Sequence, residues 1–185
     1  FDVKNDPEIR LYNEYFGGGM NAIVFQEMRE ARGLAYSAQA YMPMPSKKEL
    51  PYTYTAFIAT QNDKMQQAIE AFDEIINRMP ESEAAFEIAK KALLERIRTE
   101  RVVKEQVLWE YIFAEDMGVM EDRNKAVYEA VQQMTLADVK AAQEKWVKDR
   151  TYIYGILGDI RDLDQNFLKT LGPIQKVSQE EIFGY

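Results

Sequence analysis

Arg29 and Tyr36 are the residues of this sequence whose types and spacing best suit chemistry on a carbonyl group. The guanidinium of an arginine carries a permanent charge and presents its hydrogen-bond donors as a rigid fork. The phenol of a tyrosine is a second donor, and its hydrogen bond strengthens as negative charge develops on the acceptor. Each residue alone also has a structural explanation, since an arginine in a last helical turn offsets the helix dipole and a strand tyrosine packs in a core.

The elements around this pair predict how it is held. A glycine run, Gly17 to Gly19, breaks the chain with positive φ angles, and an amphipathic helix follows it. The apolar stripe of that helix is Met20, Ile23, Val24 and Met28. Gly33 ends the helix, and a sharp turn there brings Arg29 and Tyr36 to the same edge of a sheet.

The remaining pattern predicts an α+β fold, in which helices cover a mostly antiparallel sheet. A first helix begins with Asp6 as its N-cap and runs to Phe16. We expect a hairpin of strands 34–44 and 52–60, a central strand 152–158 buried on both faces because it is continuously apolar, and an edge strand 172–177. Further helices are predicted over 63–79, 82–97, 104–117, 121–133, 135–146 and 160–171.

Length and composition limit the class of protein. With 185 residues, 46% of them apolar, the chain is expected to form one domain with a real core. Its net charge of −8 argues against a nucleic-acid partner, which needs a cationic face. No apolar run reaches the ~20 residues of a membrane span. Because the sequence begins at Phe1, we interpret it as a fragment or a processed product, and its compartment, periplasmic or cytoplasmic, stays open.

The absence of His and Cys excludes several catalytic sites. Zinc sites normally keep at least one His or Cys, so we predict no transition-metal site in this chain and no cofactor of its own. No Ser-His-Asp arrangement can be built without His. The glycine run does not match a phosphate-binding loop, since no Gly-Lys-Ser/Thr follows it and it comes after a helix.

The motif that joins these residues resembles a known family. Gly17-Gly18-Gly19-Met20, followed by Gln26, Arg29, Gly33-Leu34 and Tyr36-Ser37, is similar to the C-terminal half domain of the pitrilysin/insulinase-type zinc metallopeptidases. The strand Tyr154-Gly-Ile-Leu-Gly-Asp159 and the closing residues 181–185 also fit that family. On this resemblance, residues 1–185 are a single half domain that does not bind zinc.

The resemblance implies a clamshell. One half carries the inverted zinc motif His-x-x-Glu-His, and the half without zinc closes over the peptide substrate. Arg29 and Tyr36 match the residues that hold the substrate main chain and help to stabilise the oxyanion. Gly17, Gly18 and Gly19 match a loop that helps to recognise substrate in some members. The expected partners are a zinc-bearing N-terminal half, in the same gene or a separate chain, and a peptide.

Two departures from the family pattern stand out. The half domain usually begins with a strand, but only a few residues precede Asp6, so that strand is missing or truncated and a sheet edge is left open to association. In addition, Leu11 to Tyr15 has the length of the zinc motif, with Leu11 and Tyr15 at the two His positions. This is either a relic of duplication or a chance match.

Three functions therefore compete. The chain is the non-catalytic half of a zinc metalloendopeptidase, inactive alone. Alternatively, it is a scaffold or non-catalytic subunit of a peptidase-like assembly without proteolytic activity. A third reading is an unrelated α+β interaction domain, which leaves the motif of residues 17–37 unexplained. A His-x-x-Glu-His sequence upstream of Phe1 would favour the first.

Overall fold

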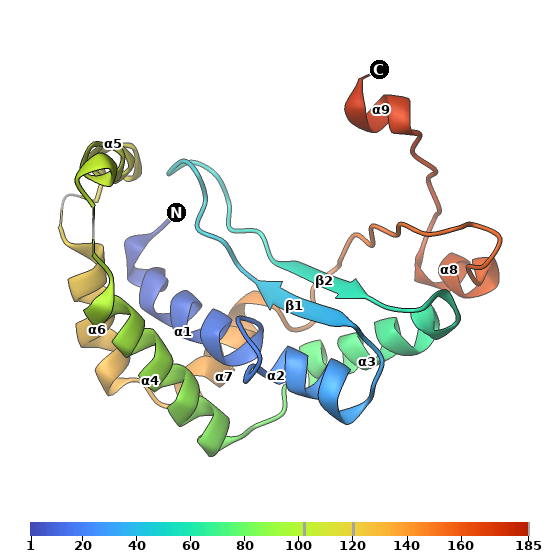
Figure 1. The fold of residues 1–185 in the computed structure, drawn as a ribbon, viewed down its shortest axis with the longest axis horizontal. Coiled ribbons are helices and arrows are strands. Elements are labelled where there is room, and N and C mark those ends of the chain that lie inside the picture. Colours follow the sequence, from blue (N-terminus) through green and yellow to red (C-terminus); the bar gives the residue numbers. More distant parts are fainter. Residues whose placement is uncertain (102, 120, 185) are drawn as a thin grey trace.

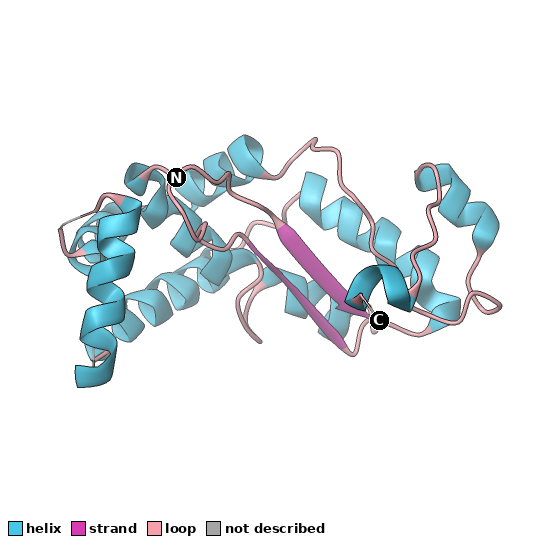
Figure 2. Cartoon of the chain, turned by 90° about the horizontal axis from the view of Figure 1, so that it is seen from above, coloured by secondary structure: helices cyan, strands magenta, loops and turns pink. Residues whose placement is uncertain are grey.

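The computed structural model describes residues 1–101, 103–119 and 121–184, so Tyr185 of the closing motif lies outside the described residues. In these residues, helices surround a two-stranded antiparallel sheet, which confirms the predicted α+β class (Figure 1). A group of helices occupies one end of the molecule in Figure 1, and the sheet lies near the middle, as Figure 2 also shows from above.

From α1 to α7 the helices and strands follow the predicted order. The α-helices are α1 (Asp6–Phe16), α2 (Ile23–Phe25), α3 (Met65–Asn77), α4 (Glu83–Thr99), α5 (Val107–Met117), α6 (Arg123–Gln133), α7 (Leu136–Trp146), α8 (Gln165–Leu171) and α9 (Gln179–Phe183). The strands are β1 (Ser37–Tyr41) and β2 (Thr55–Ala59). Single turns of other helix types are η1 (Val3–Asn5), η3 (Asn62–Lys64), η4 (Lys104–Gln106) and the π-helix η2 (Gln26–Ala31).

Helix α1 is the centre of the core. It packs against α4, α6, α7 and β1, and its apolar side chains are almost completely buried. The prediction that Asp6 caps this helix is wrong. Asn5 occupies the N-cap position, and the buried Asp6 carboxylate accepts a hydrogen bond from Arg123 of α6 at 3.1 Å. This ion pair joins the start of α1 to the helix group.

The hairpin is shorter than predicted. β1 and β2 pair from Ser37 opposite Ala59 to Tyr41 opposite Thr55. Beyond Tyr41, the backbone N–H and C=O of Met42 bind the side-chain amide of Asn13 on α1, each at 2.8 Å. A helix side chain therefore replaces β2 as the partner of this backbone, and the ladder ends.

The predicted strands near the C-terminus are wrong. Residues 152–158 are extended but belong to no sheet, and Ile153 and Leu157 are fully exposed, at 100% and 103%. Residues 172–177 form no strand, and the helix predicted from residue 160 begins only at Gln165, where Asp164 caps it. A continuously apolar run favours burial, but it does not show that another element is present to cover it.

Helix α5 was correctly predicted, but it does not pack on the core. It lies apart from the helix group in Figure 1. Most of its large apolar side chains are exposed, namely Val107, Leu108, Trp109, Tyr111 and Ile112, whereas Met117 in its last turn is buried. Gly118 ends the helix in the left-handed conformation, as expected for a C-terminal glycine.

Candidate functional site

Arg29 and Tyr36 lie side by side on the surface. The Arg29 guanidinium carbon is 5.8 Å from the centre of the Tyr36 ring and 4.9 Å from that of Phe25. The Arg29 side chain is 45% exposed and Tyr36 is 83% exposed, so both head groups remain accessible while the rings orient the guanidinium. Phe25 was not among the predicted site residues, although its position four residues before Arg29 places the two on one helix face.

The helix that carries Arg29 changes its winding. Only Ile23–Phe25 is α-helical, and Gln26–Ala31 continues as the π-helix η2. The wider winding is visible in the hydrogen bond from the Arg32 N–H to the Glu27 carbonyl, five residues back, at 3.2 Å. Short π segments are uncommon and occur often at functional sites. Here the segment contains Arg29 and therefore sets the direction of its side chain.

The turn between Arg29 and Tyr36 is fixed by backbone contacts. Gly33 has a φ of 59°, the left-handed conformation that glycine adopts without strain, which confirms the predicted turn. The N–H groups of Leu34 and Ala35 both donate to the Met28 carbonyl, at 2.9 and 3.2 Å. The Tyr36 N–H then donates to Ala59 of β2 at 2.8 Å. The side chain of Tyr36 is thus exposed, while its backbone is held by the hydrogen bond to β2.

The glycine run lies beside the same helix but is held differently than predicted. Among the described residues, none of its three glycines has a positive φ. Gly17 is buried against β1, where a Cβ atom would lie 1.7 Å from the Ala40 carbonyl oxygen. Gly18 and Gly19 are exposed. The side-chain amide of Gln26 donates to Met20 O at 2.6 Å and ties the loop to η2.

Arg29 and Arg32, the two arginines of residues 17–37, have different electrostatic surroundings. Arg32 donates to Glu74 of α3 at 2.8 Å, which raises the pKa of Arg32 and lowers that of Glu74. Arg29 lies 3.7 Å from the exposed Glu30 carboxylate, a distance and exposure at which an ion pair contributes little. Arg32 therefore joins η2 to α3, while Arg29 is available to a ligand.

The structure offers no alternative metal chemistry in the part of the chain that it describes. No group of three or more acidic side chains gathers there in a way that could hold an ion. Leu11 and Tyr15, at the two His positions of the zinc-motif length match, are buried in the core. Glu14 between them pairs with Arg96 at 2.6 Å. No described helix has the length and apolarity needed to cross a membrane.

Comparisons with known proteins indicate the family and the fold. Residues 2–93 match the family model described as the peptidase M16 inactive domain. An uncharacterized zinc protease of Rickettsia bellii (strain RML369-C) is 33% identical over 89 residues, which are 46% of this chain. The crystal structure of a peptidase M16 inactive domain from Pseudomonas fluorescens superposes with a TM-score of 0.62 over 76% of this chain, at 17% identity, and so shares the fold.

This chain corresponds to a minor part of each of those proteins. The match covers 18% of the Rickettsia protein and 34% of the Pseudomonas chain. The matched family segment contains the glycine run, Arg29 and Tyr36. The chain therefore belongs to the M16 peptidase family, the pitrilysin/insulinase type, and carries its inactive domain, which corresponds to the C-terminal half domain.

Proposed function

We propose that this chain is the non-catalytic half of a zinc-dependent metalloendopeptidase, which binds the peptide substrate for a zinc centre in a partner half domain. The observation that carries the proposal is the exposed pair of Arg29 and Tyr36, with the guanidinium stacked 5.8 Å from the phenol ring. The family match and the zinc protease relative support the zinc-bearing partner.

In this proposal, the chain's own residues act by binding and by charge stabilisation. Arg29 and Tyr36 donate hydrogen bonds to a carbonyl of the substrate main chain near the scissile bond. Such donors accelerate hydrolysis when they hold the developing oxyanion more strongly than the ground-state carbonyl. The anchored turn at Gly33 keeps both donors in place before substrate arrives, and the glycine loop at Gly17 to Gly19 contributes a contact to the peptide.

Kinetics of the complete protein test these roles. Arg29→Ala and Tyr36→Phe are each expected to lower kcat/KM for peptide hydrolysis on the order of 10- to 1000-fold, as for loss of one oxyanion donor. Arg98→Ala is the matched control, since Arg98 is an exposed arginine on α4 that pairs with Glu95. Unchanged turnover in both test variants would refute the assigned roles. A complete protein that hydrolyses no peptide would instead support a scaffold.

A further inference from the structure

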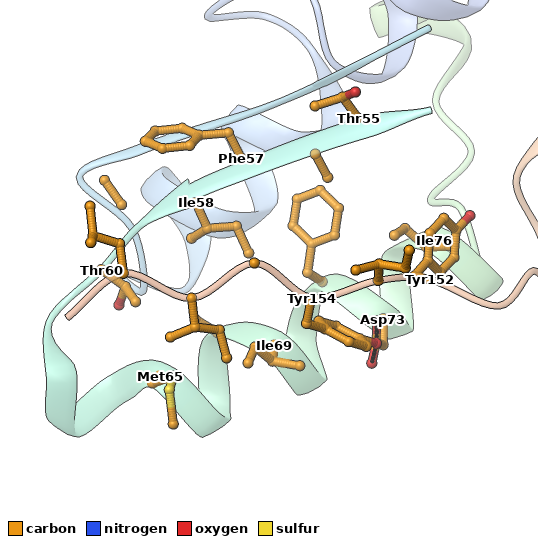
Figure 3. A pocket seen from close by; sticks show the side chains of 18 of the residues that line it. Thr55, Phe57, Ile58, Thr60, Met65, Ile69, Asp73, Ile76, Tyr152 and Tyr154 are labelled. Carbon is orange, nitrogen blue, oxygen red and sulfur yellow. Dashed lines mark hydrogen bonds between the residues drawn. The ribbon is translucent and has the colours of Figure 1, made fainter. Parts of the chain in front are cut away.

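The described residues leave more than one apolar surface open. One is a groove of about 640 Å³ between β2 and the extended segment 152–157, with α3 along its base (Figure 3). It coincides with the open sheet edge that the family resemblance implies for a missing first strand. Another is α5, which lies apart from the sheet and from the helix group in Figure 1, so that the missing strand does not account for its exposure.

Helix α5 has a fixed orientation on the molecule. The ring of Phe113 lies 5.7 Å from the guanidinium carbon of Arg123 on α6, and Met117, one turn later on the same helix face, is buried. At the end of the helix, a Cβ atom on Gly118 would lie 3.1 Å from Nζ of Lys48 in the hairpin loop. The face of α5 opposite Phe113 and Met117 therefore points away from the core.

This outward face is apolar in its middle and charged at its ends. Leu108, Tyr111 and Ile112 share the face, and all three are exposed. Lys104 lies one turn before Leu108, in η4, and Glu115 lies one turn after Tyr111. From Lys104 through Leu108 and Tyr111 to Glu115, the steps of four, three and four residues are those of a seam that packs against another helix.

The charges at the two ends select the helix that fits this seam. Lys104 and Glu115 are exposed, and in the part of the chain that the structure describes neither forms an ion pair. Each also opposes the dipole of its own helix, since the cation precedes the N-terminus and the anion lies in the last turn. Against an antiparallel copy of α5, each charge meets the opposite charge and the end of the partner helix that it stabilises.

The seam is also self-complementary in its spacing. Lys104 and Glu115 lie equally far from the midpoint between Leu108 and Tyr111. A single two-fold axis through that midpoint therefore aligns the charged pairs and the apolar pairs at the same time. This is the property that an interface between identical subunits requires.

We propose that α5 is a dimerisation helix, and that its occupant is α5 of a second copy of this protein, packed antiparallel across a two-fold axis. Leu108 packs against Tyr111 of the partner subunit, and Lys104 pairs with Glu115 of the partner subunit, once on each side of the axis. Val107 and Trp109 flank the seam. This inference concerns assembly and does not depend on the proposed peptidase function.

Sedimentation equilibrium of the complete protein tests the pairing. The protein should form a dimer as its concentration rises, and Leu108→Asp is expected to raise the dimer Kd by at least about 30-fold, as for loss of a central interface residue. Ile88→Asp, at an exposed apolar residue of α4, is the matched control and should leave the Kd unchanged. Circular dichroism checks that both variants fold. A dimer that Leu108→Asp leaves intact would overturn the proposal.

Charge reversal tests the antiparallel register. Lys104→Glu and Glu115→Lys each place like charges opposite one another and are expected to raise the dimer Kd on the order of 10-fold. The double variant Lys104→Glu/Glu115→Lys restores both pairs across the axis and should recover the parent Kd. Lys125→Glu, in the exposed pair with Glu129 on α6, makes the same change in net charge and should have no effect. A double variant as weak as the single variants would contradict this register.

A different occupant of α5 predicts a different result. If another part of the same polypeptide covers the helix, the complete protein stays monomeric at every concentration, and that outcome overturns the proposal. Peptide hydrolysis does not enter any of these measurements, so failure of the dimer and failure of the proposed function remain distinguishable.

Discussion

Arg29 and Tyr36 form one unit rather than two separate donors. The Arg29 guanidinium lies against the rings of both Phe25 and Tyr36, so the guanidinium and the phenol project from the surface side by side. Residues that act on the same substrate atom and orient each other are not independent, and their mutational effects are not additive. The spacing in the sequence therefore predicted the pair, but only the structure shows the shared stacking.

This stacking predicts a kinetic coupling. The double variant Arg29→Ala/Tyr36→Phe of the complete protein is expected to lose less kcat/KM than the product of the two single losses, because removal of either partner already disorders the other. The four kcat/KM values of the cycle measure this coupling. Losses that multiply would show two independent contacts instead.

The ion pair of Asp6 and Arg123 is expected to stabilise the fold. The Asp6 side chain is 6% exposed, and loss of its charge leaves the partly buried Arg123 without this counter-charge. We expect Asp6→Asn to lower the free energy of unfolding by about 1–3 kcal/mol, below the value for a fully buried pair. Glu95→Gln, in the exposed pair with Arg98, should cost less than about 1 kcal/mol. Urea unfolding compares them, and equal costs would contradict this account.

Buried tyrosines predict a loss of stability at alkaline pH. Burial raises the pKa of Tyr52 and of Tyr152 to about 12 and also raises the pKa values of Tyr12 and Tyr54. Their unfolded pKa is about 10. The neutral phenols therefore contribute stability that is complete below about pH 10 and is lost as the pH rises toward 12.

Thermal unfolding between about pH 8 and 11.5, with phenolate absorbance as a second signal, measures this effect. Tm should hold steady up to about pH 9.5 and fall above it. Tyr52→Phe removes one of the titrating groups, so its Tm should fall less steeply. A Tm that is independent of pH up to 11.5 would show that these phenols do not ionise on unfolding.

At the scale of the elements, the contact between the glycine loop and β1 predicts that alanine substitutions at Gly17 and Gly19 differ in their effect on stability. Gly17→Ala places a methyl group in the Ala40 carbonyl, so the loop or the strand must move. We expect a loss of about 1–3 kcal/mol, as for overpacking of a core. Gly19→Ala meets no atom within 4 Å and should change stability by less than about 0.5 kcal/mol. Chemical denaturation measures the free energy of unfolding of both variants. A Gly17→Ala protein with the same free energy of unfolding as the parent would refute the close approach of Gly17 to the Ala40 carbonyl.

The sequence predicted elements with a strong local pattern better than those that depend on a neighbour. Helix α1, the start of α4, which was predicted from residue 82, and the turn at Gly33 follow from local spacing and turn signals. The π-helix η2 carries no local signal that distinguishes it from an α-helix. Residues 152–158 were predicted as a buried strand, but a strand needs a partner, and in this chain β2 does not reach them.

The candidate functional surfaces also differ in how far the sequence could predict them. The residue types and the glycine turn predicted where Arg29 and Tyr36 would meet, because both depend on a few residues of contiguous chain. The groove beside β2 was not predicted, since it is formed by residues about a hundred positions apart, Thr55 to Thr60 and Tyr152 to Leu157. Only the folded chain brings these walls together.

At the scale of the whole molecule, the chain has exposed surfaces of the kind found on one component of a larger assembly. An apolar helix, α5, and an apolar strand-like segment, 152–158, lie exposed, while the core around α1 is well buried. Surfaces of this kind are typical of contact sites. The exposed Arg29 and Tyr36 pair offers binding groups but neither a nucleophile nor a metal ligand set. The proposed function assigns both to a partner half that carries zinc.

The most direct test of the account is peptide hydrolysis by the 185-residue chain and by the complete protein, each with and without added Zn²⁺. The account predicts zinc-dependent hydrolysis by the complete protein, which a chelator abolishes, and no hydrolysis by the 185-residue chain at any zinc concentration. Hydrolysis of peptide by the purified 185-residue chain alone would contradict it.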